Sequence, residues 1–281
     1  MSDLQAYLDD LQLTVPTSQS LDFVCSLQSH HIAQYSFNNL AVLLGEDISL
    51  NLSHILDKIV IQGFGGYCFE HNKLAFEFLS HLGYDVRLVM ARVLNGQLLD
   101  RPRTHRITLV SIQDDVYLVD MGFGADCPTQ PLRLEPDIEQ TIATDTYRIV
   151  KSADGEFDLQ IWKPQSKQFY TLYRFDLAHY TDEDCVLGNF YSSKHPKAVF
   201  VNNLVASIKD DKRTAGIRNH VYFIRQNGTE TECLIESAEA LHKLLAEAFH
   251  IHVESVIAEH LFDRFIAPKL AEVHACNAIN P

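Results

Sequence analysis

The chain has 281 residues, of which 46% are hydrophobic and 21% charged, and its formal net charge at pH 7 is −14. A chain of this length can bury a substantial core, whereas its negative charge argues against nucleic acid as a partner. No apolar run approaches the ~20 residues of a membrane-spanning helix, and the acidic start MSDLQAYLDDL lacks the features of a secretory signal. We therefore expect a cytoplasmic protein with no membrane partner.

Neither a disulfide framework nor a metal site is expected. The six cysteines are scattered, without a CxxC pair or the spacing of zinc ligands. In a cytosolic chain, such cysteines are most simply small buried apolar residues. His250, His252 and His260 cluster near a predicted helix end, but no cysteine or carboxylate stands at zinc-ligand spacing from them.

Helices are predicted for the first part of the chain, residues 1–83. After the glycine-rich stretch GFGGYC, the residues Ala75, Phe78, Leu79 and Leu82 recur at the spacing of one helix face. Gly83 follows directly and supplies a helix stop.

Strands are predicted for the middle part, residues 84–192. The segments 86–94, 106–112 and 116–123 are rich in β-branched residues, and turn-forming sequences separate them. Further short strand candidates continue to about residue 190. A run of strands without alternating helices favours an antiparallel sheet or barrel, and hence an α+β fold.

The last part, residues 193–281, mixes both kinds of element. The sequence HVYFIRQNGTETECLI predicts a hairpin that turns at Asn227 and Gly228. The segment SAEALHKLLAEAFHI then predicts a helix, because its leucines and Phe249 fall on one face.

Cys68 is the strongest candidate for a nucleophile. The glycines of GFGGYC allow a sharp turn beside the sulfur, and a predicted helix begins at this point. The positive end of a helix dipole and its unpaired N–H groups favour a thiolate, which is the reactive form of cysteine. The alternative is a buried structural cysteine at the end of a tight loop.

A base and an orienting carboxylate can be chosen for Cys68 from two neighbouring strands. His105 stands where a loop becomes a strand, and Asp120 stands at the end of the following strand. Two strands joined by a short turn can present an imidazole and a carboxylate side by side. Taken singly, His105 could be an ordinary rim histidine and Asp120 a turn-capping carboxylate.

Around these three residues the sequence resembles the arylamine N-acetyltransferases. The resemblance rests on GGYCFEHN around Cys68, THRITLV around His105 and YLVDMGFG around Asp120, and it continues in CPTQPLRL and NFYSSKHPKAVF. It spans the chain and implies a helical N-terminal domain, an antiparallel β-barrel domain and an α/β lid. It also implies a Cys-His-Asp triad that carries an acetyl group from acetyl-CoA to an aromatic amine or hydrazine in a ping-pong reaction. By the same resemblance Phe37, Phe123, Gly124 and Cys127 would line the acceptor pocket.

Two basic islands suggest where the phosphates of CoA bind. Residues 87–106 carry a net charge of +4 and residues 194–225 a net charge of +5, within an otherwise acidic chain. Solvated surface charge is the simpler interpretation of such islands. Our candidates for the phosphate contacts are Arg101, Arg103, Lys209, Lys212 and Arg213, and the resemblance adds Thr214.

One position departs from the family pattern, and it keeps other functions open. Members usually carry Arg directly before the Gly-Gly pair, where this chain has Phe64. We expect an active enzyme with a less stable loop around Cys68. The alternatives are an ansamycin-type amide synthase with the same fold, a thiol hydrolase, or a non-catalytic relative that binds CoA or another ligand.

Overall fold

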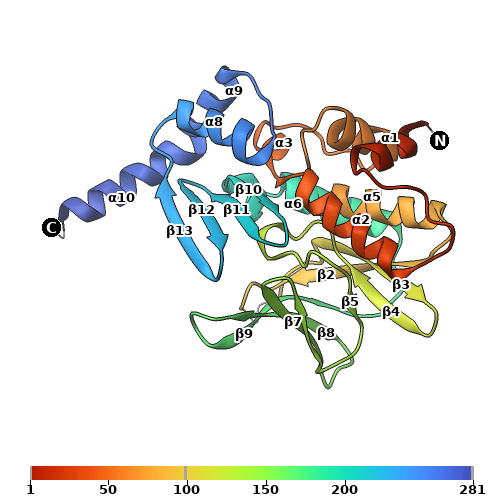
Figure 1. Cartoon of the computed structure of the whole chain (residues 1–281). Coiled ribbons are helices and arrows are strands. Elements are labelled where there is room, and N and C mark those ends of the chain that lie inside the picture. Colours follow the sequence, from red (N-terminus) through yellow and green to blue (C-terminus); the bar gives the residue numbers. More distant parts are fainter. Residues whose placement is uncertain (1, 98–99, 280–281) are drawn as a thin grey trace.

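The computed structural model describes residues 2–97 and 100–279, and helices occupy its first part (Figure 1). A π-helical turn, η1, continues α4 directly and leads into the glycine-rich loop before α5. The elements of this part are α1 (Ser2–Asp10), α2 (Leu21–Gln34), β1 (Phe37–Asn38), α3 (Leu40–Leu43), α4 (Leu52–Leu56), η1 (Asp57–Ile61) and α5 (Cys68–His81).

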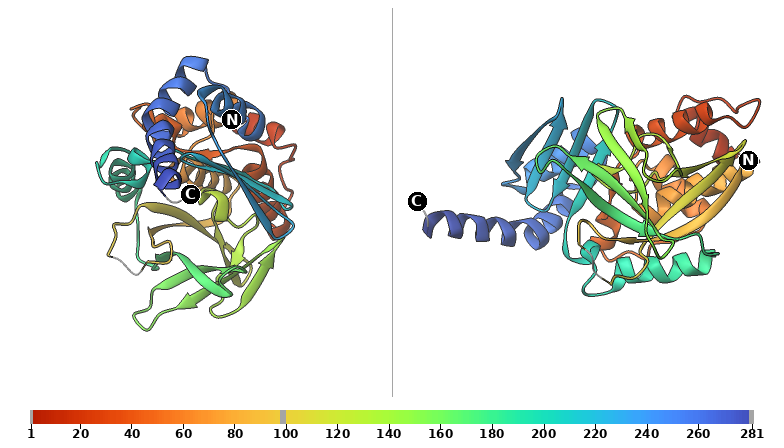
Figure 2. Two further views of the ribbon diagram at one scale, coloured as in Figure 1. Left: turned by 90° about the vertical axis from the view of Figure 1, so that its left-hand side faces the viewer. Right: turned by 90° about the horizontal axis from the view of Figure 1, so that it is seen from below.

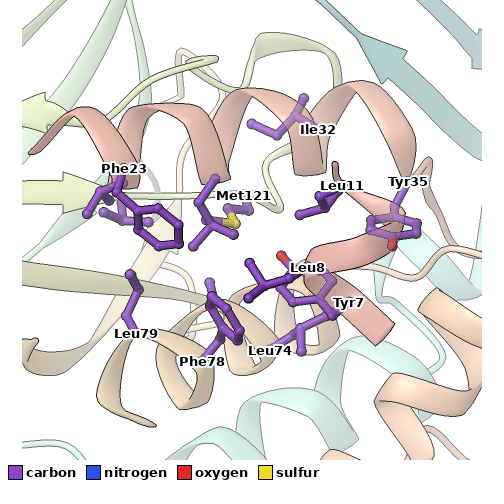
Figure 3. Close-up of a cluster of buried hydrophobic side chains, with 14 of the residues drawn as sticks. Tyr7, Leu8, Leu11, Phe23, Ile32, Tyr35, Leu74, Phe78, Leu79 and Met121 are labelled. Carbon is purple, nitrogen blue, oxygen red and sulfur yellow. The ribbon is translucent and has the colours of Figure 1, made fainter. Parts of the chain in front are cut away.

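The helical part packs around its own hydrophobic core. Figure 3 shows Tyr7 and Leu8 of α1 lying between α2 and α5. Phe78, on the predicted apolar face of α5, makes an edge-on contact with Tyr7 at a ring-centroid distance of 5.1 Å. Met121 of the following sheet region belongs to the same cluster, so this core also joins α5 to the strands.

The middle part is an eight-stranded antiparallel sheet that curls into a nearly closed barrel, as expected. Its strand order is β5-β4-β3-β2-β9-β8-β7-β6. The two edge strands meet through Gln140, whose side chain donates to the carbonyl of Arg133 at 2.9 Å and accepts from its N–H at 2.8 Å. The strands are β2 (Asp85–Val93), β3 (His105–Ile112), β4 (Asp115–Val119), β5 (Leu132–Arg133), β6 (Glu139–Ile142), β7 (Asp145–Lys151), β8 (Phe157–Lys163) and β9 (Gln168–Phe175).

The prediction of strands up to about residue 190 is wrong, because the barrel ends with β9 and a helix, α6 (Asp182–Lys194), follows. Thr181 caps this helix: its N–H and hydroxyl both donate to the Asp184 carboxylate, at 2.8 and 2.9 Å. The helix also runs across the boundary between residues 192 and 193, where the sequence predicts the start of the last part. Apolar residues on both sides of α6 conceal its helical period in the sequence.

The last part is a five-stranded sheet covered by helices. The expected hairpin is confirmed, with Asn227 and Gly228 both at positive φ in its turn, and so is the helix over α8. The tiny strand β1 adds to this sheet by pairing Phe37 with Ser207, so the first 83 residues also contribute to the last part. The elements are α7 (Val199–Asn202), β10 (Val205–Lys209), β11 (Arg213–Arg218), β12 (Val221–Gln226), β13 (Thr229–Leu234), α8 (Ala238–Phe249), α9 (Ser255–Leu261), η3 (Phe262–Ile266) and α10 (Ala267–Ile279).

The C-terminal helix α10 extends away from the body of the molecule (Figures 1 and 2). Over residues 2–97 and 100–279, no helix is both long and apolar enough to cross a membrane.

Candidate active site

Cys68 is the first residue of α5, as predicted, and its side chain is almost buried, with 3% of the residue exposed. Glycines are required around it. A Cβ on Gly65, which has φ +71°, would lie 2.2 Å from the carbonyl oxygen of Ser36, and a Cβ on Gly122 would lie 2.8 Å from the Cα of Cys68. The loop before Cys68 and the turn after Asp120 therefore pack too closely for any larger residue.

His105 and Asp120 meet as the two-strand argument predicts. His105 begins β3 and Asp120 directly follows β4, its antiparallel neighbour, and His105 Nε2 lies 2.7 Å from Asp120 Oδ2. The carboxylate can only accept here, so Nε2 carries the hydrogen and Nδ1 is left as the base. Cys68 Sγ lies 3.6 Å from the carbonyl oxygen of Thr104, the residue before His105, and Cys68 and His105 line the same cavity. The structure thus brings the three predicted residues together.

Three further groups hold Asp120, and none of them was identified from the sequence. Asn72 Nδ2 donates to Oδ1 at 2.9 Å, the N–H of Gly122 donates to Oδ1 at 3.0 Å, and the hydroxyl of Tyr173 donates to Oδ2 at 3.0 Å. Asn72 could have been found, because it follows Cys68 by one helical turn. Tyr173 lies on β9, far along the chain, and no local signal points to it.

The pKa values of Asp120 and Cys68 move in opposite directions. Burial favours the protonated form of Asp120, but the charge of His105 and the hydrogen bonds from His105 and Asn72 outweigh it and lower the pKa of this carboxyl. Burial raises the pKa of the Cys68 thiol well above its ordinary value, and the negative charge of Asp120 adds to this. The N–H of Phe69 at the helix start acts in the expected direction and lowers the pKa, but it is the smaller effect. The thiol must therefore pass its proton to a base before it can attack.

An ion pair supports the loop before Cys68. Lys58 Nζ of η1 lies 2.7 Å from Glu70 Oε1, while Glu70 Oε2 accepts from the N–H of Tyr67 at 3.1 Å. Burial raises the pKa of Glu70, and the charge of Lys58 partly offsets this. The ring of Phe64 packs against the hydrophobic core of the last part of the chain, and its carbonyl accepts a hydrogen bond from Asn38 Nδ2 at 2.8 Å. A cation therefore reaches the acidic group of this loop although position 64 carries none.

A chain of buried hydrogen bonds reaches the same loop from the other side. The hydroxyl of Tyr7 lies 2.7 Å from His31 Nδ1, and His31 Nε2 lies 2.7 Å from His71 Nδ1. His71 Nε2 lies 3.0 Å from the carbonyl of Gly66, which can only accept. The donors are therefore Tyr7 OH, His31 Nε2 and His71 Nε2, and both imidazoles are neutral.

The cavity at Cys68 has a volume of about 560 Å³. Phe37, Phe123 and Gly124 line it, and their place at the acceptor stays a prediction. Phe123 also packs on the ring of His105 at a centroid distance of 5.0 Å. Cys127 does not line the cavity: it is buried, and its thiol donates to the carbonyl of Asp120 at 3.0 Å. Its contact is with the backbone that carries the triad carboxylate.

Of the predicted phosphate contacts, only Arg101 lines the cavity. Lys209 is buried, and its Nζ lies 2.7 Å both from the carbonyl of Cys127 and from Asp145 Oδ2. Arg103 pairs with the carboxylate of Asp176.

The other three predicted contacts also lie outside the cavity lining. Thr214 is buried in β11 opposite Lys209, Arg213 Nη2 donates to the hydroxyl of Tyr222 at 3.1 Å, and Lys212 neighbours Arg213 on the exposed turn before β11. The net charge of a segment does not show where its side chains point, and these side chains lie outside the cavity.

Other cations line the cavity instead, namely Lys197, Arg218 and Arg225. Arg225 is held by Asp126 and Glu230, each at 3.0 Å. Arg218 lies 2.9 Å from Glu230. Within the part of the chain that the structure describes, no group of three or more His, Cys, Asp or Glu side chains is arranged to hold a metal ion.

Comparisons with known proteins show what this sequence and this fold are similar to. The N-acetyltransferase family model matches residues 20–258. The arylamine N-acetyltransferase of Mycobacterium tuberculosis is 36% identical over 261 residues, which cover 90% of this chain and 91% of that protein. The enzyme of the same name from Escherichia coli is 31% identical over 262 residues, or 92% of each. Among solved structures, Mycobacterium marinum arylamine N-acetyltransferase in complex with CoA superposes with a TM-score of 0.88 at 31% identity, covering 94% of this chain and 99% of that one.

Proposed function

This chain belongs to the arylamine N-acetyltransferase family, and from that premise we propose that it transfers acetyl groups from acetyl-CoA to the nitrogen of aromatic amines or hydrazines through an acetyl-Cys68 intermediate. One observation carries the proposal. Cys68 and His105 share a cavity, and the Nε2 of His105 is held by Asp120 at 2.7 Å, which leaves Nδ1 available as a base.

In the first half-reaction, Cys68 gives its proton to His105 Nδ1, and its sulfur attacks the carbonyl carbon of the acetyl thioester. The new Sγ–C bond forms as the C–S bond to CoA breaks, and the departing CoA sulfur takes the proton from His105. Because burial raises the pKa of Cys68, the thiolate exists only while His105 holds its proton. Asp120 stabilises the imidazolium of that state, which is why its lowered pKa matters.

In the second half-reaction, the nitrogen of the acceptor attacks the acetyl carbon on Cys68. An aromatic amine is unprotonated at neutral pH, so its lone pair is available. The C–Sγ bond breaks as the C–N bond forms, and the proton of the nitrogen passes through His105 to the sulfur. The products are the amide and the free thiol, so the enzyme is ready for another acetyl-CoA.

The lining of the cavity divides into two kinds of surface. The aromatic rings of Phe37, Phe123 and Phe200 offer an apolar face to an aromatic acceptor. Arg101 and Lys197 offer cations for the phosphates of CoA, replacing the buried Lys209 in that role. The CoA bound in the Mycobacterium marinum relative supports this co-substrate.

Initial-velocity kinetics test the proposal. We expect double-reciprocal plots against acetyl-CoA, at several fixed concentrations of an arylamine or arylhydrazine, to give parallel lines. The Cys68→Ala variant should show no turnover. Intersecting lines with wild-type protein would exclude the acetyl-enzyme, and CoA binding without turnover of any aromatic amine would leave a non-catalytic relative.

A further inference from the structure

The outward face of α6 is apolar at its centre. Val186, Leu187 and Phe190 are 46%, 71% and 66% exposed, and the latter two are the most exposed large apolar side chains in the part of the chain that the structure describes. Single exposed apolar residues are normal on a soluble protein, whereas three of this size on one helix face mark an interaction surface.

The opposite face of α6 fixes the helix, so the apolar residues cannot turn inward. A Cβ on Gly188 would lie 2.7 Å from the ring of Phe69, which shows how closely α6 lies on the start of α5. Asn189 accepts a hydrogen bond from the hydroxyl of Tyr67. Both views of Figure 2 place α6 (teal) on an outer edge of the molecule, where a second molecule can approach it.

Charge at the two ends of this face indicates what covers it. Glu183 and Lys194 are exposed and eleven residues apart, which is three helical turns, so they flank the apolar residues on the same face. In an antiparallel pair of two such helices with Leu187 opposite Phe190, Glu183 falls opposite Lys194, and each contact occurs twice. This is the self-complementary pattern of a two-fold interface.

We propose that two copies of this chain associate through α6, antiparallel about a two-fold axis between Leu187 and Phe190. A single helix pair buries less surface than the ~1,200–2,000 Å² of stable complexes, so the dimer is weak and reversible. The proposal concerns assembly and does not depend on the acetyl transfer proposed above.

Lys194 already has partners within the chain: its Nζ lies 2.8 Å from the carboxylate of Asp47 and donates to the carbonyls of Glu46 and Gly45 at 3.1 and 3.3 Å. The side chain of Asp47 is 97% exposed, and a surface pair of this kind contributes little. Lys194 therefore remains able to approach Glu183 of a second copy. The contact with Asp47 also requires a test that separates the two partners.

Charge exchange provides that test, measured by sedimentation velocity on the full chain over a wide range of protein concentration. Glu183→Lys alone and Lys194→Glu alone each set like charges opposite one another twice, and each should weaken the dimer about tenfold. The double variant should regain the wild-type dissociation constant. The contact of Lys194 with Asp47 cannot explain such a recovery, since the double variant does not restore it.

An apolar substitution and a matched control complete the experiment. Leu187→Asp should abolish the dimer without changing the circular dichroism spectrum, because Leu187 is mostly exposed. Val256→Glu, on the exposed surface of α9, should leave association unchanged. A wild-type chain that stays monomeric at every concentration would overturn the proposal, and so would a dimer that the double charge exchange fails to restore.

Discussion

We expect two buried histidines of the helical part to make the stability of this protein depend on pH. Burial lowers the pKa of His71 to about 4, and burial together with the nearby His71 lowers that of His31 well below its ordinary value. In the unfolded chain both titrate near pH 6.5. The unfolded chain therefore binds more protons than the folded chain as the pH falls below 6.5, and stability decreases with falling pH down to about pH 4.

The size of the effect follows from these values. Between pH 7 and pH 5, a histidine that titrates at 6.5 when unfolded and stays neutral when folded lowers the free energy of unfolding by about 2 kcal/mol. His31 and His71 together should therefore lower it by about 4 kcal/mol. A protonated imidazole would also lose its acceptor at Nδ1, which breaks the chain from Tyr7 to the carbonyl of Gly66.

Urea unfolding at pH 7, 6 and 5, followed by circular dichroism, measures the effect. In the His31→Gln/His71→Gln variant, the glutamine side chains can still donate and accept hydrogen bonds, but they do not bind a proton as the pH falls. The pH-dependent loss of stability should be smaller in this variant by about 4 kcal/mol. His81→Gln, an exposed change on the same helix α5, should leave the wild-type dependence in place. Equal pH dependence in the wild-type and double-variant proteins would refute the reasoning.

The other predictions concern the nucleophile loop, the triad and the CoA site. Lys58→Met leaves the buried carboxylate of Glu70 without its cation and should lower the free energy of unfolding by about 2–3 kcal/mol, measured with urea. Lys58→Arg should keep most of this stability, and equal losses in the two variants would contradict a stabilising ion pair. Tyr173→Phe removes one hydrogen bond from Asp120 and should lower kcat/KM about tenfold with an unchanged circular dichroism spectrum. An unchanged kcat/KM would mean that this hydrogen bond does not contribute to the reaction. Lys197→Met should raise the KM for acetyl-CoA about three- to tenfold and leave the KM for the amine unchanged; the reverse pattern would place this cation at the acceptor.

The sequence predicts that Cys68, His105 and Asp120 lie close together, because local structure places each of the three residues. A helix start places Cys68, and the short hairpin between β3 and β4 sets His105 beside Asp120. The hairpin at Asn227 and the helix α8 were equally accessible, because their turn residues and apolar period lie within a few positions of one another.

The remaining features depend on side-chain direction or on contacts distant in sequence. Counting charges marked Lys209 as a phosphate contact, but its side chain points into the protein and pairs with Asp145. Tyr173 reaches Asp120 across 53 positions of the chain. The helix α6 was missed because Leu187 and Phe190 leave its outer face apolar, which removes the alternation that identifies a surface helix.

The most direct test of acetyl transfer through Cys68 is the intact mass of the protein after mixing with acetyl-CoA alone, beside the Cys68→Ala variant. We expect the wild-type protein to gain one acetyl group, which an aromatic amine then removes, and the variant to gain none. An unmodified wild-type protein that releases no CoA, or an equal gain in the variant, would contradict the proposed mechanism.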